Sequence, residues 1–132
     1  MNALDLNLRI KAPSGVIFMP FHSSHLDTMS MDQPDMEGAS VEDNKQHIIW
    51  QAKTANPITV RQNGKTLGVW GANPIWDGLQ EAWFVVDDVC RMYPKSMTKV
   101  ARLWIKDKFV NKEIHRLQIT VRQSDDRAYN WA

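Results

Sequence analysis

The sequence predicts a single domain of mixed α/β (α+β) type, in which helices flank a central, mainly antiparallel sheet. Short segments of alternating apolar and polar residues are separated by turn signals, and segments with helical periodicity lie between them. Asn63-Gly64, between two of the alternating segments, is a strong signal for a two-residue hairpin turn, which joins antiparallel strands. A length of 132 residues suits one domain with one core.

The first half of the chain predicts an N-terminal arm, a strand and a helix. Residues 1–15 alternate leucines with polar residues, which is typical of a strand or an arm, and 16–21 is a short apolar strand. Residues 28–40 resemble a loop. Ser40, with Glu42 and Asp43 in the first turn after it, predicts the start of a helix, which we expect to end before Pro57. The predicted domain therefore covers residues 16–132, with 1–15 as the arm.

His22 and His25 are the one motif in this half with metal-binding character. Their spacing brings two ligands together only on a helix or in a tight loop, and Asp27 is the only further candidate ligand nearby. We therefore interpret the segment as a turn or helix start that is capped by Ser23 or Ser24, and we expect no metal.

The second half predicts the hairpin, a third strand, a helix, a strand and a final helix. We expect strands at 58–62 and 66–71, a loop at 73–78, and a strand at 82–86. Gly68 and Gly71 indicate a bulge or a close approach by another group. The chain stops about two turns into the helix predicted after Ser124, so we expect that the C-terminal strands of the domain are missing from it.

A helix is predicted from residues 94–96 onward, because proline suits the first helical position. Its apolar residues cover about half of the helix circumference, which predicts a broad buried face. That face comprises Met97, Val100, Ala101, Trp104, Ile105 and Phe109.

Composition indicates an ordinary globular protein with an uneven charge distribution. The chain is 43% hydrophobic and 23% charged, and no apolar run approaches the roughly 20 residues of a membrane helix. Residues 1–11 lack the pattern of a signal peptide, and a single cysteine excludes an internal disulfide, so we expect a reducing, intracellular setting.

The helix that begins near residue 94 carries most of the excess positive charge. This pattern is typical of a solvated face, and it would also suit attraction of phosphate, of nucleic acid or of an acidic partner. The sequence pI of about 7.9 argues against a dedicated nucleic-acid binder.

Residues 81–112 form a strand, a short polar turn with Arg91, and this basic helix. Such a junction directs free backbone N–H groups and the positive end of a helix dipole to one place, which favours phosphate binding. The element order and this junction resemble the GCN5-related N-acetyltransferase (GNAT) fold. In that family the turn reads Arg or Gln, two residues, Gly, one residue, Gly or Ala, and its amides bind the pyrophosphate of acetyl-CoA.

Arg91 matches the first position of that turn, but Pro94 and Ser96 replace its two glycines. Pro94 removes one N–H from the phosphate cradle and Ser96 adds a side chain, while Lys95 and Arg91 could compensate with charge. The resemblance implies acetyl-CoA as a possible cofactor, with the following binding residues: Val85, Val86, Arg91, Met92, Tyr93, Lys95 and Ser96.

The resemblance also implies where catalytic groups would lie. Glu81, at the start of the strand before the turn, is the best candidate for a general base, followed by Asp87 or Asp88. The family's leaving-group tyrosine corresponds to Ala132, which has no hydroxyl, and Tyr129 lies almost one helical turn earlier.

A narrower resemblance rests on an ordered set of short motifs. Glycines at 64, 68 and 71, then Trp83-Phe84-Val85, then Asp88 to Lys95, are similar to the small acetyltransferase-like proteins of short-tailed phages. Those are internal virion or head-assembly proteins. The resemblance therefore implies a location in a host cytoplasm or a virion, and other phage structural proteins as partners, with contacts through the N-terminal arm.

Three hypotheses follow. The first is a phage virion- or assembly-associated protein of GNAT fold with a degenerate acetyl-CoA loop. The second is an active acyl-CoA-dependent N-acetyltransferase that acts on an unknown amine. The third is a protein whose basic helix binds nucleic acid or an acidic partner.

Overall fold

The computed structural model describes residues 1–29, 41–87 and 93–119. In these ranges the chain forms a five-stranded sheet whose strands follow one another in chain order. β1 to β4 are antiparallel to their neighbours, and β5 runs parallel to β4, which confirms the predicted mixed α/β fold with a mainly antiparallel sheet. The strands are β1 (Val16–Pro20), β2 (Ile58–Gln62), β3 (Lys65–Trp76), β4 (Leu79–Val86) and β5 (Arg116–Ile119).

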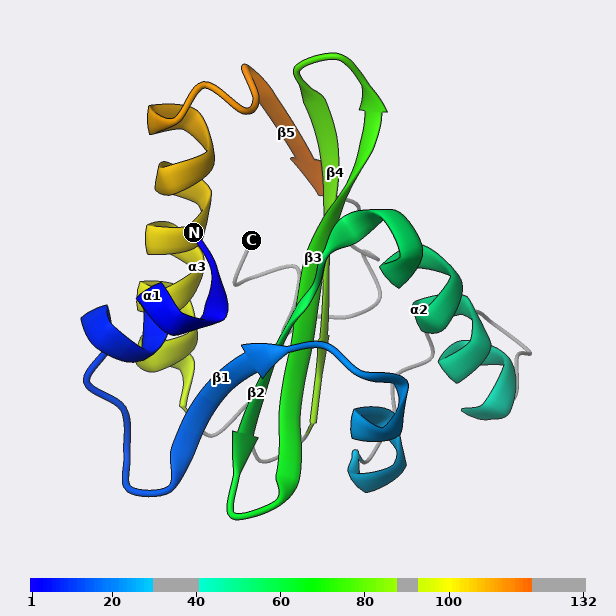
Figure 1. Ribbon diagram of the computed structural model, residues 1–132, viewed down its shortest axis with the longest axis vertical. Helices are drawn as coiled ribbons and strands as arrows, with labels where there is room; N and C mark the ends of the chain where they lie inside the picture. Colours follow the sequence, from blue (N-terminus) through cyan, green and yellow to red (C-terminus); the bar gives the residue numbers. More distant parts are fainter. Residues whose placement is uncertain (30–40, 88–92, 120–132) are drawn as a thin grey trace.

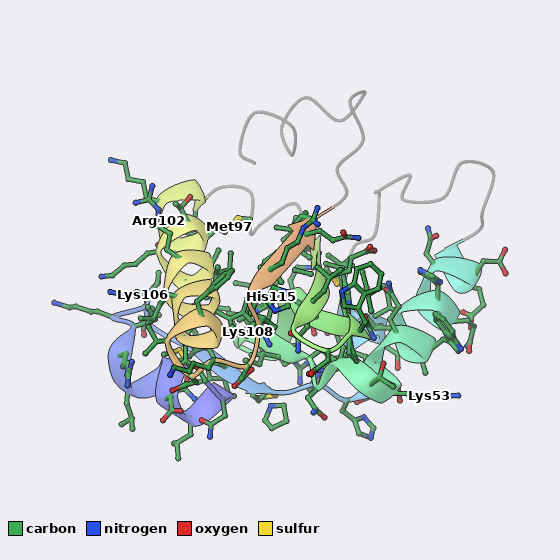
Figure 2. The ribbon with its side chains drawn as sticks, turned by 90° about the horizontal axis from the view of Figure 1, so that it is seen from above. Lys53, Met97, Arg102, Lys106, Lys108 and His115 are labelled. Carbon is green, nitrogen blue, oxygen red and sulfur yellow. The ribbon has the colours of Figure 1, made fainter. Side chains whose placement is uncertain are left out.

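Helices cover both faces of the sheet (Figure 1). α1 (Ala3–Arg9) and α3 (Pro94–Val110) lie on one face, and the short 3-10 helix η1 (Ser23–Thr28) and α2 (Val41–Ala55) lie on the other. The view from above shows the same separation of α3 from α2 (Figure 2). In the part of the chain that the structure describes, every helix is too short or too polar to span a bilayer.

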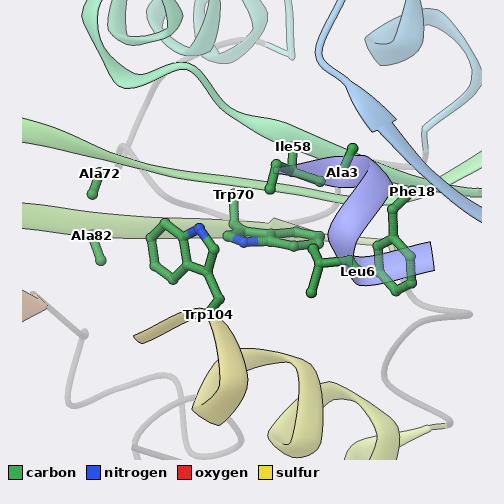
Figure 3. Packing of buried hydrophobic residues seen from close by; sticks show 8 residues of the cluster. All are labelled: Ala3, Leu6, Phe18, Ile58, Trp70, Ala72, Ala82 and Trp104. Atoms are coloured by element: carbon green, nitrogen blue, oxygen red, sulfur yellow. The ribbon is translucent and has the colours of Figure 1, made fainter. Parts of the chain in front are cut away.

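Each face of the sheet has its own apolar cluster. On the α1–α3 face, Trp70 of β3 lies between Trp104 of α3 and Leu6 of α1, and Phe18 of β1 completes this layer (Figure 3). On the other face, residues of η1 and α2 pack against β3 and β4. Side chains that alternate along β4 therefore belong to opposite layers, which decides the face on which each candidate residue lies.

The N-terminal segment is helical over residues 3–9, so the strand, one of the two alternatives for its alternating leucines, is wrong. The Asn2 side chain caps α1 by accepting a hydrogen bond from the Asp5 backbone N–H, and the Asp5 carboxylate accepts one from the Asn2 backbone N–H. The helix buries Ala3 and Leu6, which are three residues apart and share one helix face. The boundary between an arm of residues 1–15 and a domain of 16–132 stays a prediction.

β3 is longer than predicted. It continues through Asn73 and Pro74 to Trp76, where we expected a loop, and a turn at Asp77-Gly78 leads into β4. The pairing register shifts between Pro74 and Trp76, and such an irregularity tolerates a residue that lacks an N–H.

The other predicted elements are largely confirmed. The hairpin turn at Asn63-Gly64 has positive φ at both residues, as a two-residue turn of this kind needs. Gly71 marks a close approach: a Cβ there would lie 3.1 Å from Ala55 Cβ and 3.2 Å from Trp83. The helix predicted to start at Ser124 lies outside the described residues.

Two predicted details at helices are wrong. Phe109 is 42% exposed, because it lies about 140° around α3 from the buried Trp104. The N-cap of η1 is His22 rather than Ser23 or Ser24, since the His22 ring accepts a hydrogen bond from the Ser24 backbone.

Candidate active site

β4 and α3 are joined at the place where the sequence predicts a phosphate site. β4 ends at Val86, α3 begins at Pro94, and residues 88–92 lie outside the described ranges. Asp87 is 1% exposed, its N–H donates to the Leu67 carbonyl, and its carboxylate lies 3.3 Å from Lys65 Nζ. Asp87 therefore ties the end of β4 to β3 from within the domain.

The first turn of α3 combines backbone N–H donors with a positively charged side chain. Tyr93 is the N-cap, its side chain makes no capping hydrogen bond, and the turn contains no acidic residue. The N–H groups of Lys95 and Ser96 have no acceptor within the helix at these positions. Both residues are exposed. Pro94 lacks an N–H, so this helix start offers an anion fewer donors than one without proline.

The backbone N–H and C=O groups of the two valines at the end of β4 point to opposite sides of that strand. Val85 lies opposite Val69 of β3, two residues along from the bond between the Asp87 N–H and the Leu67 carbonyl. Alternate residues of an antiparallel strand form backbone hydrogen bonds with the same neighbouring strand. The N–H and C=O groups of Val85, like those of Asp87, therefore face β3. Those of Val86 face the side on which β5 lies. Of the predicted pair, Val86 is thus the residue whose backbone N–H and C=O groups point to the β5 side of β4.

Glu81 occupies the paired part of β4 and β5. It lies opposite Gln118 of β5, and the Gln118 amide donates to Glu81 Oε2 at 2.9 Å. Glu81 is half-buried and, by alternation with Val85, lies on the α2 face of the sheet. Gln118 was not predicted from the sequence, because its position opposite Glu81 depends on the parallel register of two distant segments.

The acid and the helix start lie at opposite ends of β4. Five residues separate Glu81 from Val86, which corresponds to about 17 Å of extended chain. A ligand that reached both would need an anionic group at α3, a long narrow arm along β4, and its reactive group near Glu81.

A hydrogen-bond network holds α2 against the Glu81 face. The Asn73 amide donates to the Gln51 carbonyl at 2.8 Å and to the Thr54 hydroxyl at 2.7 Å, and its oxygen accepts from Trp83 Nε1 at 2.7 Å. This network fixes the last turns of α2 over β3 and β4. The sequence offered no signal for it, since we expected Asn73 in a loop.

The two histidines of the predicted turn are engaged in local structure. His25 Nδ1 accepts from the His22 backbone N–H at 3.1 Å and lies 2.9 Å from the Thr59 hydroxyl. Burial lowers the pKa of His25 from its usual 6.5, and the charges of Arg61 and His22 lower it further. The pair therefore stabilises η1 against β2, remote from β4.

The structure brings together only part of the predicted site. Tyr93, Lys95 and Ser96 share the start of α3, and Val86 and Glu81 share β4. The remaining predicted residues, Arg91, Met92, Tyr129 and the alternative base Asp88, lie outside the described residues.

Comparison with solved structures finds the same arrangement of elements in acetyltransferases. A GNAT-family acetyltransferase from Bacillus anthracis matches with a TM-score of 0.59 and 16% identity, over 92% of this chain and 78% of that one. An N-acetyltransferase from Staphylococcus aureus Mu50 matches with a TM-score of 0.64 and 13% identity, over 89% and 80% of the two chains.

The chain has the GNAT fold. Ard1 from Thermoplasma volcanium adds a third match, with a TM-score of 0.65, 14% identity and coverage of 89% and 78%. At these identities the likeness shows the fold alone. No protein-family model matches the sequence, and a comparison with curated proteins finds no match.

Proposed function

We propose that this GNAT-fold chain binds acyl-CoA at the junction of β4 and α3, through a phosphate cradle weaker than one built on glycines. The first turn of α3, the next described element after β4, supports this most strongly, because it contains no acidic residue and the side chain of its N-cap Tyr93 makes no capping hydrogen bond. Lys95 adds an exposed cation, and the N–H groups of Lys95 and Ser96 add donors for a pyrophosphate. Pro94 removes a donor, which is the reason to expect weak binding.

Calorimetric titration with CoA and acetyl-CoA tests this proposal. We expect saturable binding that Lys95→Glu weakens by at least about tenfold, or about 1.4 kcal/mol. Lys53→Glu is the matched control, because Lys53 is exposed on α2 and changes the net charge equally. Absence of binding at millimolar ligand, or equal binding by the two variants, would overturn the proposal.

A second candidate function, N-acetyl transfer, is supported by the position of Glu81. When bound, acetyl-CoA supplies an activated thioester carbonyl that an amine can attack. Glu81, held by Gln118, would accept the proton of that amine as the C–N bond forms. The C–S bond of the thioester would break, and CoA would leave as a thiolate that takes up a proton. The names of similar structures include a spermidine N-acetyltransferase and an acetyltransferase of a ribosomal protein N-terminus. An acceptor panel should therefore contain polyamines and peptide N-termini, and no turnover on either would count against transfer.

A role in a phage virion or in its assembly is a further proposal. It rests on the resemblance of the ordered motifs between Gly64 and Lys95 to phage proteins, as does the expectation of structural partners. Mass spectrometry of purified virions from a phage that encodes the chain provides the test. Detection of the chain at stoichiometric level would support the role, and absence of the chain from both virions and assembly intermediates would exclude that role.

A further inference from the structure

The outer side of α3 carries a row of cations. Lys95, Lys99, Arg102 and Lys106 are all exposed, and at 100° per residue they fall within about 60° of one another. We call these four residues the α3 cationic stripe. It lies on the opposite side of the helix from Trp104, which is buried against the sheet. Figure 2 shows Arg102 and Lys106 pointing away from the domain.

Among the residues that the structure describes, the other charges of α3 have partners, whereas no ion pair is formed by the stripe. Lys108 lies 2.9 Å from Gln80 Oε1, 3.5 Å from Glu113 and 4.9 Å from the centre of the Trp104 ring. Asp107, the one acid of this helix, is paired with the N-terminal ammonium of Met1. Within residues 1–29, 41–87 and 93–119, no acidic side chain forms an ion pair with a stripe residue. The stripe's charge is therefore directed to solvent.

The dimensions of the stripe suit a linear polyanion. Eleven residues separate Lys95 from Lys106, so the stripe is about 16 Å long. One strand of duplex DNA places a phosphate about every 3.4 Å along the axis, so the stripe would lie alongside about five phosphates. The chain as a whole has a formal net charge of only +1, but acidic residues elsewhere do not neutralise the stripe, because charges more than about 10 Å apart are screened at 0.1 M salt.

The composition of the stripe favours a phosphate backbone over an acidic protein. Protein interfaces have an apolar core inside a polar rim, whereas backbone contacts to nucleic acid come mainly from Lys and Arg. The exposed apolar residues of α3, Phe109 and Val110, lie beyond the last cation of the stripe.

We propose that the α3 cationic stripe is a nucleic-acid-binding surface that contacts the phosphate backbone without reading sequence. This surface is separate from the proposed acyl-CoA site over most of its length, since only Lys95 belongs to both. Binding without base contacts implies a dissociation constant on the order of 10⁻⁵ M at physiological salt.

The test is fluorescence anisotropy with a labelled 20-base-pair duplex of arbitrary sequence, at several salt concentrations. Four phosphate contacts give an expected slope of about −3.6 in log K against log salt, or about a 150-fold loss between 50 and 200 mM. Arg102→Gln/Lys106→Gln should reduce the slope to about −1.8. Lys53→Gln/Arg116→Gln removes the same charge from exposed positions outside the stripe and should leave the slope unchanged.

Three results would overturn the proposal: no binding at low salt, an equal loss in the two double variants, or tighter binding to poly-glutamate than to DNA. Lys99→Gln/Arg102→Gln should repeat the loss if the first variant folds poorly, as judged by circular dichroism. Failure of CoA binding does not affect this test, because Arg102 and Lys106 lie outside the residues proposed for CoA.

Discussion

Asn7 of α1 closes the outer edge of β1 by bonding both backbone groups of Phe18. Its amide donates to the Phe18 carbonyl, and its oxygen accepts from the Phe18 N–H, each at 2.8 Å. β1 is an edge strand, and unpaired edges invite pairing with other chains. Pro20, which has no N–H, ends the same strand. One side chain thus both anchors the N-terminal helix and blocks the edge of the sheet.

Replacing Asn7 with alanine should destabilise the fold and open this edge. We expect the free energy of unfolding in urea to fall by about 1–3 kcal/mol, because two backbone groups lose their partner. Size-exclusion chromatography should show self-association. Arg9→Ala, an exposed change in the same helix, should stay within about 0.5 kcal/mol of the parent. Equal stability of the two variants would show that the clamp is dispensable.

Gly71→Ala should disturb the packing of β3 against the end of α2. The new Cβ would lie 3.1 Å from Ala55 Cβ and 3.2 Å from Pro57 Cβ, so we expect a loss of about 1–3 kcal/mol in unfolding free energy. Combining it with Ala55→Gly removes the shortest contact, so the double variant should lose less than the sum of the singles. Strict additivity in urea denaturation would contradict this explanation.

Stability should fall as the pH drops below 6.5, the usual pKa of histidine. Burial, Arg61 and His22 lower the pKa of His25, so between that lowered value and 6.5 the unfolded chain binds more protons than the folded one. Above 6.5 this contribution is fully present. Protonation also removes the acceptor at Nδ1 that the His22 N–H uses.

Urea midpoints between pH 5 and 8 provide the measurement. His25→Gln should flatten the decline, whereas His47→Gln, which changes an exposed histidine of α2, should retain it. A decline of equal size in both variants would assign the effect to another group.

Glu81→Gln should separate catalysis from cofactor binding if the chain transfers acetyl groups. Loss of a general base lowers kcat by about 10²–10⁴-fold, while the affinity for CoA, set at the start of α3, should not change. Asp77→Asn removes an exposed carboxylate from the same hairpin and serves as the control. Single-turnover assays would measure the difference, and unaltered turnover in Glu81→Gln would exclude the proposed role.

Elements with strong local signals could be predicted from the sequence. Asn63-Gly64 needs positive φ at both positions, and Pro94 is suited to a first helical turn, so the hairpin and α3 appear where expected. Local signals failed where a distant partner decides the outcome. Residues 73–76 contain Asn and Pro and resemble a loop, yet pairing with β4 extends the strand through them.

The candidate site shows the same division. The resemblance to the GNAT fold put Glu81 on a strand and Lys95 and Ser96 at the start of the next helix, and the structure has them in these elements. The bond from Gln118 to Glu81, the facing of Val86 toward β5, and the ion pair of Lys65 with Asp87 depend on registers between segments far apart in sequence.

The sequence by itself determined the order of the elements from β1 to β5, the hairpin and the cationic side of α3, because turn chemistry and helix periodicity are properties of neighbouring residues. Only the tertiary structure decided that residues 3–9 form a helix and that Asn7 pairs with Phe18, because a short segment adopts the conformation that its packing surface stabilises. It also decided which face of the sheet presents Glu81, since strand register sets the direction of every side chain.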